Sequence, residues 1–180
     1  MKQHLKFLKS EIEGLYTIER SQIEDERGFF SRFFCEEEYK NIGFIQPIRQ
    51  MNNSFTKKKG SVRGMHFQNA PFQETKIVRC IKGKIFDVAV DIRKNSPTFL
   101  QWHSEILTAD KGNSLFIPEG FAHGFQTLTN NCELLYMHSN FYSQEAEGAL
   151  NAFDPKINIS WPLEVTEVSD RDRNNPLIDK

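Results

Sequence analysis

Six side chains that could transfer protons or bind an anion stand in strand-like segments between residues 63 and 136. Charged residues in strands normally face solvent, and for any one of the six a surface or satisfied core position is the ordinary interpretation. Six in one stretch that is otherwise rich in apolar residues favour a cavity that they line together. Imidazole, phenol and ammonium groups in such a cavity suit acid–base catalysis. The six residues are Arg63, His66, Lys76, Asp87, His123 and Tyr136.

The run Pro118-Glu-Gly-Phe-Ala-His123 resembles the second half of the cupin signature, PxGxxH. In metal-binding cupins the first half supplies two histidines one residue apart and a carboxylate. Here Gln68 stands where a second histidine would follow His66. One or two imidazoles without clustered carboxylates make a poor transition-metal site. We therefore expect the barrel fold without a metal or another cofactor.

The segments that carry these side chains are predicted to be strands. The clearest are residues 76–81 and 84–92, which flank Lys82-Gly83 and are predicted to form a hairpin. Alternation along the second segment separates two faces, of which the polar one would face the cavity and the apolar one a second layer. The apolar face holds Phe86, Val88 and Val90, and the other holds Asp87, Ala89 and Asp91.

Further short strands and two brief helices complete the predicted fold. Helix signals are confined to residues 36–40 and to a short C-terminal helix that Ser169 would cap. No repeat or linker divides the chain, so residues 1–180 are expected to form one domain. The fold class is all-β, a cupin-type jelly-roll barrel or sandwich with a few short peripheral helices. Other strands are expected at 14–18, 50–55, 61–68, 99–107, 114–117, 121–128 and 133–140, with a turn at 57–60.

Composition restricts the partners and the compartment. The 23 Lys and Arg residues against 24 Asp and Glu leave a net charge of −1, which argues against nucleic acid as a partner. The N-terminal residues lack an apolar signal-peptide core, and no apolar run is long enough for a membrane helix. The three cysteines are widely spaced and suit a reducing cytosol. We therefore expect a cytoplasmic protein without a membrane or nucleic-acid partner.

Eight runs from about residue 14 to the C-terminus carry a family resemblance, with spacing that fits throughout. They include Val62-Arg-Gly-Met-His-Phe-Gln68 and Ile117-Pro-Glu-Gly-Phe-Ala-His-Gly-Phe125. The others are residues 25–29, 50–54, 76–80, 83–93, 96–99 and 159–162. Together they resemble the dTDP-4-dehydrorhamnose 3,5-epimerase family. The resemblance implies conversion of dTDP-4-dehydro-6-deoxy-D-glucose to dTDP-4-dehydro-L-rhamnose.

The resemblance also assigns catalytic roles. Hydrogens at C3 and C5 flank the C4 ketone of this sugar, so removal of either gives an enolate that needs a base, an opposite-face donor and an oxyanion partner. His66 matches the base, and Asp172 matches the carboxylate that orients it, although Asp170 is an alternative two residues away. Tyr136 matches the proton donor, and Lys76 matches the cation beside the enolate oxygen.

The same matching predicts the substrate-binding residues. Guanidinium groups suit phosphate oxygens, so two arginines are expected to bind the diphosphate. Arg63 and His66 have opposite parity along one strand, and a bulge at Gly64 would be required to bring both into the cavity. The expected binding residues are Arg27 and Arg63 at the diphosphate, Gln50 and Asn52 as hydrogen-bonding groups, Tyr142 stacked on the base, and His123, Glu147 and Arg171 at further contacts.

Four positions depart from the family pattern and leave the nucleotide and the sugar open. An alternative is a 5- or 3-epimerase of a CDP- or GDP-linked 4-keto-6-deoxy sugar. A non-catalytic sugar-nucleotide-binding cupin and a metal-dependent cupin oxygenase are further alternatives. The family also implies a homodimer, with residues 14–18 as the segment that crosses to the partner. The departures are Ile23 for an aromatic, Arg32 for a glutamate, Met51 for an acidic residue and Met137 for a lysine.

Overall fold

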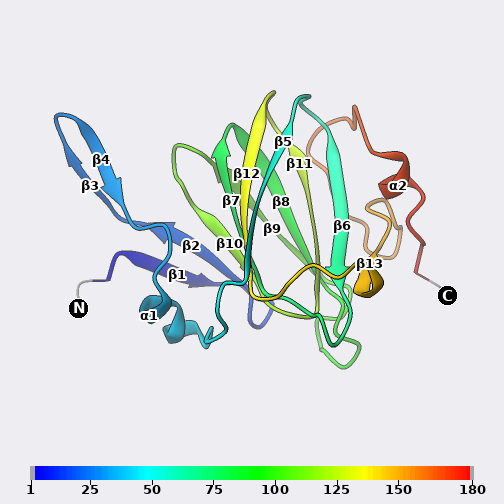
Figure 1. Cartoon of the computed structure of the whole chain (residues 1–180). Helices are drawn as coiled ribbons and strands as arrows, with labels where there is room; N and C mark the ends of the chain where they lie inside the picture. The colour runs from blue at the N-terminus through cyan, green and yellow to red at the C-terminus, as the bar shows by residue number, and fades with distance from the viewer. Residues whose placement is uncertain (1–2, 179–180) are drawn as a thin grey trace.

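Two antiparallel sheets face each other in the computed structural model, which describes residues 3–178 (Figure 1). The six-stranded sheet contains, in spatial order, β1 (Leu5–Lys9), β2 (Tyr16–Arg20), β10 (Ser114–Ile117), β7 (Lys76–Lys82), β12 (Cys132–His138) and β5 (Gln50–Thr56). The five-stranded sheet contains β13 (Glu147–Ala149), β6 (Val62–Gln68), β11 (Phe121–Thr127), β8 (Lys84–Asp91) and β9 (Trp102–Thr108). The predicted all-β jelly roll is confirmed.

A separate two-stranded hairpin and four short helical turns surround the sheets. The hairpin pairs β3 (Gln22–Asp25) with β4 (Gly28–Ser31) and projects away from the barrel on the side of the N-terminus (Figure 1). Both predicted helices are present, and the Ser169 side chain accepts from the Asp172 amide as a cap. The helical turns are α1 (Glu36–Tyr39), η1 (Lys40–Ile42), η2 (Gln144–Ala146) and α2 (Asp170–Arg173).

The predicted hairpin of residues 76–81 and 84–92 is wrong, because its two strands belong to different sheets. β7 pairs with β10 and β12, whereas β8 pairs with β9 and β11. Gly83, at a φ of 82°, connects the two strands where the chain passes from one sheet to the other. A turn between strands of one sheet and a crossing between two sheets have similar local sequences, and only the partner strands distinguish them.

Most of the other strand predictions are confirmed, with shifts at their ends. Residues 99–107 are strand only from Trp102, because Ser96 and Thr98 form a turn whose hydroxyls donate to Asp91. Of the predicted strand 14–18, residues 16–18 belong to β2, which pairs with β1 and β10 of its own chain. The sequence did not single out β1, β3, β4 or β13.

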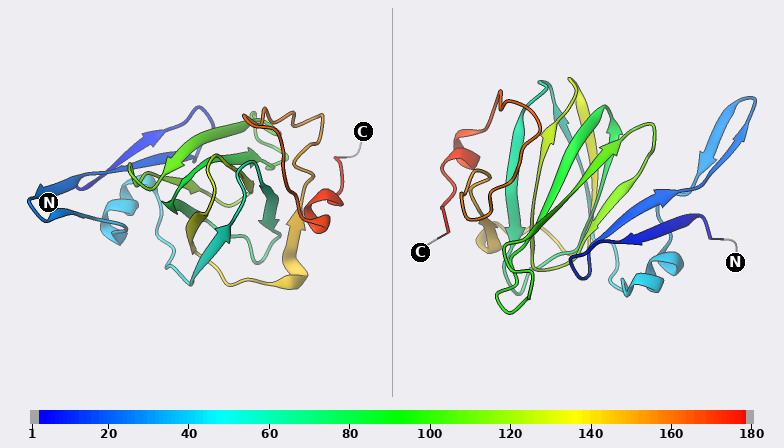
Figure 2. Two further views of the ribbon diagram at one scale, coloured as in Figure 1. Left: turned by 90° about the horizontal axis from the view of Figure 1, so that it is seen from above. Right: turned by 180° about the vertical axis from the view of Figure 1, so that it is seen from behind.

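Apolar side chains pack in three clusters that follow the alternation of the strands. The first fills the space between the sheets and includes Ala89, Leu115 and Phe125. The second covers the outer face of the five-stranded sheet, where Val88 and Val90 meet the C-terminal segment. Figure 2 shows that segment along β6, on the side opposite the N-terminal strands. The predicted division of β8 into an inner and an outer face is therefore confirmed.

A third cluster covers the outer face of the six-stranded sheet, where Tyr39 and Phe44 pack on Ile77, Phe116 and Met137. Within residues 3–178, none of the helices has the length and apolar character that crossing a membrane requires.

The bulge expected at Gly64 is present where β6 meets β11. His66 pairs with His123 and Arg63 pairs with Phe125, so three steps along β6 match two steps along β11. A Cβ atom on Gly64 would lie 2.6 Å from the Cα of Gly124, and its φ is 126°. Only glycine fits this contact and this backbone conformation.

Gly64→Ala is expected to lower the free energy of unfolding by about 3 kcal/mol, since it combines overpacking with a strained φ. Gly43→Ala is the matched control, because Gly43 has a φ of 80° but nothing within 4 Å of its Cβ position. Its cost should be about 1 kcal/mol, from the backbone alone. Urea denaturation of both variants measures the difference. Equal losses would contradict the role given to the contact with Gly124.

Candidate active site

A cavity of about 290 Å³ lies between the two sheets and receives side chains from both. β6 and β11 of the five-stranded sheet form one wall, and β5, β7 and β12 of the six-stranded sheet form the other. The bulge lets β6 contribute two side chains three positions apart. Six of the predicted site residues line this one cavity: Asn52, Arg63, His66, Lys76, His123 and Tyr136.

His66 is held by a carboxylate behind it. Its Nε2 lies 2.7 Å from Oδ1 of Asp172, while Oδ2 of Asp172 accepts from the Gly64 amide at 3.2 Å. Burial alone would raise the pKa of Asp172, but the hydrogen bond and charge of His66 and the Gly64 amide outweigh it and lower that pKa. Asp172 rather than Asp170 is therefore the partner of His66. The half-exposed imidazole keeps its other nitrogen available for chemistry.

Tyr136 lies on the opposite wall from His66, on β12. Its hydroxyl is 3.3 Å from the Ser54 hydroxyl, and its ring lies edge-on to the His123 ring with centroids 6.1 Å apart. Burial raises the pKa of Tyr136 well above the usual range of a phenol. The phenol therefore keeps its proton at neutral pH, as a proton donor must.

Lys76 supplies the buried cation of the cavity. Its ammonium lies 3.2 Å from a carboxylate oxygen of Glu74 and donates to the His66 carbonyl oxygen at 3.3 Å. With 8% of its surface exposed, it is shielded from water on most sides. A charge in such surroundings acts on a developing oxyanion more strongly than it would in solvent.

His123 pairs with Asp87 on the neighbouring strand, a pairing that the sequence analysis did not assign. Nε2 of His123 lies 2.8 Å from Oδ1 of Asp87, and both side chains are buried. Burial raises the pKa of Asp87, against the smaller effect of His123. The signal in the sequence that could have indicated this pair is the position of Asp87 on the inward face of β8. Asp87 orients the imidazole of His123 toward the cavity.

A more open groove beside β13 holds three further predicted residues. The Tyr142 hydroxyl donates to Glu147 at 3.1 Å, and Glu147 also forms an ion pair with Arg171. The hydrogen bond from Arg171 and the hydroxyl of Tyr142 lower the pKa of Glu147, although burial acts in the opposite direction. Gln50 connects groove and cavity, since it accepts from the Tyr142 amide and donates to Asn52.

Arg27 is the predicted site residue that lies apart from the others. It stands in the turn of the β3–β4 hairpin, fully exposed, with Asp25 as its ion-pair partner. None of the four departures from the family pattern lines the cavity either. Met137 is buried on the outer face of the six-stranded sheet, and Arg32 pairs with Glu38.

Two further residues of the cavity region were missed by sequence reasoning. His138 lines the cavity, two positions after Tyr136 and therefore on the same face of β12. Glu74 precedes β7 and forms buried ion pairs with both His138 and Lys76. The parity of His138 could have identified it, but no local pattern connects Glu74 with a residue 64 positions later.

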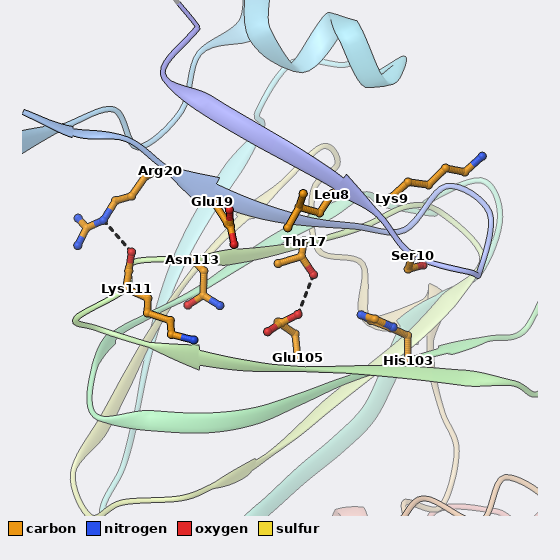
Figure 3. Close-up of a pocket in the computed structure, with 10 residues that line it drawn as sticks. All are labelled: Leu8, Lys9, Ser10, Thr17, Glu19, Arg20, His103, Glu105, Lys111 and Asn113. Carbon is orange, nitrogen blue, oxygen red and sulfur yellow. Dashed lines mark hydrogen bonds between the residues drawn. The ribbon is translucent and has the colours of Figure 1, made fainter.

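A second cavity, about 470 Å³, lies between β1 and β2 on one side and β9 on the other (Figure 3). There Thr17 donates to Glu105 at 2.9 Å, and the buried Nε2 of His103 has no hydrogen-bond partner. None of the predicted site residues lines this cavity. Among residues 3–178, no group of three or more His, Cys, Asp and Glu side chains could hold a metal ion.

Comparison with known proteins agrees with this geometry. The family model described as dTDP-4-dehydrorhamnose 3,5-epimerase matches residues 9–180. A dTDP-4-dehydrorhamnose 3,5-epimerase from Shigella flexneri is 42% identical over 168 residues, which cover 93% of this chain and 92% of that protein. This chain belongs to the dTDP-4-dehydrorhamnose 3,5-epimerase family. It is thus a member of a family of isomerases.

Solved structures of similar proteins show which kinds of epimerase share this fold. The epimerase from Legionella pneumophila, in complex with dTDP-4-keto-L-rhamnose, has a TM-score of 0.92 and 37% identity, over 97% of this chain and 93% of that one. A 3'-monoepimerase from Streptomyces bikiniensis, in complex with dTDP-quinovose, has a TM-score of 0.86 and 31% identity, over 93% and 85%. The fold is thus shared by epimerases that differ in the number of carbons they invert.

Asp172→Asn should make the epimerase less stable at neutral pH, by an amount that shrinks in acid. A carboxyl whose pKa is lower in the folded state stabilises fully above its unfolded pKa of about 3.9. That stabilisation is lost as pH falls through the folded pKa. The difference in unfolding free energy should therefore decrease as the pH falls below about 4. Urea denaturation across this range measures it, with the neighbouring exposed Asp170→Asn as control. An equal pH-dependent effect in the control would contradict the assignment.

Proposed function

We propose that this enzyme converts dTDP-4-dehydro-6-deoxy-D-glucose to dTDP-4-dehydro-L-rhamnose by inverting C3 and C5. The observation that carries the proposal is the placement of His66 and Tyr136 on opposite walls of one cavity. Inversion of a carbon next to a ketone requires removal of a proton from one face and delivery to the other. The sugar would occupy the cavity with its ring between the two side chains.

His66 removes the proton in the first step. Its imidazole takes a hydrogen from C5 or C3 as H⁺, and the electron pair of the C–H bond moves to form the enolate of the C4 ketone. Asp172 stabilises the imidazolium that results, at 2.7 Å from Nε2. Lys76 stabilises the enolate oxygen, since its ammonium is already held beside the cavity by Glu74.

Tyr136 completes the inversion in the second step. Its hydroxyl gives a proton to the opposite face of the same carbon, and the enolate returns to the ketone. The phenolate that remains regains a proton from water, and His66 loses its proton to water. Because burial raises the pKa of Tyr136, its phenol keeps its proton until an enolate, a much stronger base, is present to accept it. The net reaction needs no oxidant and no cofactor.

The remaining site residues would bind the nucleotide. Arg63, which is exposed at the mouth of the cavity, would bind the diphosphate. Tyr142 and Arg171 line the groove beside β13, where an aromatic ring and a cation suit a base and a phosphate. His123, Asn52 and Gln50 would hydrogen-bond the sugar, and Glu147 would hold Tyr142 and Arg171 in place.

A single-carbon epimerase is the second candidate function. The similarity to a 3'-monoepimerase favours it, because the same fold serves both reactions. CDP- and GDP-linked sugars are alternative substrates, since Ile23, Arg32 and Met51 differ from the family pattern near the nucleoside.

The protein is also proposed to be a cytoplasmic homodimer. All residues of β3 and most of β4 are exposed, among them Ile23, Phe29 and Phe30 with 55%, 54% and 73% of their surface accessible. A lone two-stranded hairpin with such apolar exposure is rarely stable in water, so a second subunit is its natural partner. Docked over the partner's cavity, the hairpin would bring Arg27 to the diphosphate. The free cysteines suit a reducing compartment.

The proposed function predicts hydrogen exchange at C3 and C5 when enzyme and dTDP-4-dehydro-6-deoxy-D-glucose are mixed in heavy water. Proton NMR should record loss of both signals, and a reductase should trap a rhamnose-configured product. Exchange at one carbon would support the single-carbon reaction, and absence of exchange with this substrate would contradict the proposal.

Two variants separate the base from the donor in the same experiment. His66→Ala should slow exchange by at least about 100-fold, because no base remains. Tyr136→Phe should retain exchange, since His66 can return a proton to the face it came from, while inverted product falls by at least about 100-fold. Normal inversion by the Tyr136→Phe variant would show that Tyr136 is not the proton donor.

The dimer predicts complementation between two defective variants. Arg27→Ala and His66→Ala homodimers should each be impaired, whereas a mixed dimer has one complete site, with Arg27 from one subunit and His66 from the other. After subunit exchange in an equal mixture, about a quarter of the wild-type activity should return. Sedimentation should give about twice the 21.0 kDa chain mass. Failure to recover activity in mixed dimers would place Arg27 outside the partner's site.

A further inference from the structure

Glu74 and His138 form a buried ionisable pair that the proton-transfer steps do not use. Nδ1 of His138 lies 2.8 Å from Oε2 of Glu74, and Oε1 of Glu74 lies 3.2 Å from the Lys76 ammonium. Burial alone would raise the pKa of Glu74, but His138 and Lys76 outweigh it and lower that pKa. The carboxylate is therefore ionised, and it contacts both His138 and Lys76.

The carboxylate determines which nitrogen of His138 carries hydrogen. An ionised carboxylate only accepts, so Nδ1 must donate to it. In a neutral imidazole Nε2 is then an acceptor, and the Asn52 amide nitrogen lies 3.3 Å from it. The ring of His138 is also stacked on the ring of Tyr136, with centroids 6.0 Å apart and planes 23° from parallel.

The orientation passes along a chain of hydrogen bonds toward the groove. Because Asn52 donates to His138, its carbonyl oxygen faces Gln50, whose amide nitrogen donates to it at 3.2 Å. The carbonyl oxygen of Gln50 then accepts from the Tyr142 backbone amide at 3.1 Å. Donors and acceptors alternate without conflict from Glu74 to Tyr142. If the side-chain amide of Asn52 or Gln50 were rotated by 180°, two donors would face each other at one of its contacts.

The network thus connects the two ends of the proposed substrate site. At one end Glu74 holds Lys76, which also donates to the His66 carbonyl oxygen. At the other end lies Tyr142, which borders the groove. The ionisable groups that face His138 are Glu74 before β7, Lys76 on β7 and Tyr136 on β12 itself, while β5 presents the neutral Asn52.

We propose that Glu74 and His138 are positioning residues of this enzyme. Glu74 holds the Lys76 ammonium beside the ketone oxygen, and His138, with its hydrogen at Nδ1, sets the orientation of the Asn52 and Gln50 amides toward the sugar nucleotide. The role in catalysis rests on the proposed function, whereas the tautomer and the amide orientation do not.

The two residues should therefore affect different kinetic constants. His138→Phe keeps an aromatic ring against Tyr136 but removes the acceptor for Asn52, so KM should rise about tenfold with kcat within about threefold. His138→Gln, which keeps one donor and one acceptor, should restore part of the loss. Glu74→Gln removes the negative charge that pairs with Lys76 and leaves one acceptor oxygen for the two donors Lys76 and His138, so kcat should fall at least about tenfold.

His103→Phe is the control, because His103 is another strand histidine with little solvent exposure, although it is less buried than His138. It faces the second cavity and is no part of the network (Figure 3). Its KM and kcat should remain those of the wild type. A loss in His103→Phe equal to that in His138→Phe would mean that any strand histidine has this effect, and would overturn the positioning role.

NMR of wild-type protein with 15N-labelled histidine tests the network without turnover. The His138 ring should carry hydrogen at Nδ1 and none at Nε2 near neutral pH, and binding of dTDP should leave this pattern unchanged. A hydrogen at Nε2 would overturn the proposal even if the enzyme is active. If the wild-type enzyme neither exchanges the hydrogens at C3 and C5 nor inverts the sugar, the proposed function is wrong. The position of hydrogen on the His138 ring still tests the proposed network in that case. Wild-type activity with unchanged KM in His138→Phe would overturn the positioning role alone.

Discussion

The close contact between Gly64 on β6 and Gly124 on β11 is the constraint on which the site depends. It accommodates the bulge that brings Arg63 and His66, three positions apart, to the same cavity. The bulge also directs the Gly64 amide toward Asp172, so that the C-terminal helix α2 is attached where its carboxylate meets His66. One backbone irregularity therefore places the base, its carboxylate and an arginine together.

Three histidine–carboxylate pairs organise the interior around that contact. A buried carboxylate is costly unless it is paired, and each pairing also determines the orientation of a ring. The two members of each pair come from positions 36, 64 and 106 residues apart in the sequence. They are His66 with Asp172, His123 with Asp87 and His138 with Glu74, at 2.7, 2.8 and 2.8 Å.

The jelly-roll connections explain why acid and base can work from opposite sides. The chain passes between sheets at almost every step from β5 to β13, so neighbouring segments of sequence lie on facing walls. His66 and Tyr136 belong to different sheets for this reason. Related epimerases of the same fold invert one or two carbons. The facing walls suit both reactions, and the position of the sugar between them would decide which carbon meets the base.

The sequence by itself determined most of the barrel strands, the inward face of β8 and the membership of His66, Tyr136 and Lys76 in one cavity. These properties follow from alternation and from motifs, which are local and are retained in any register that buries the apolar face. Even the need for a bulge at Gly64 could be inferred, because parity along a strand is local as well.

Only the tertiary structure decided which strands pair and which distant side chains meet. The hairpin predicted at Gly83 was wrong because a local pattern does not reveal whether the next strand joins the same sheet or the facing one. The position at which α2 packs decides that Asp172, and not Asp170, pairs with His66. Glu74 contacts His138 only because β7 and β12 are neighbouring strands. Contacts of this kind depend on closure of the whole barrel, which no short stretch of residues encodes.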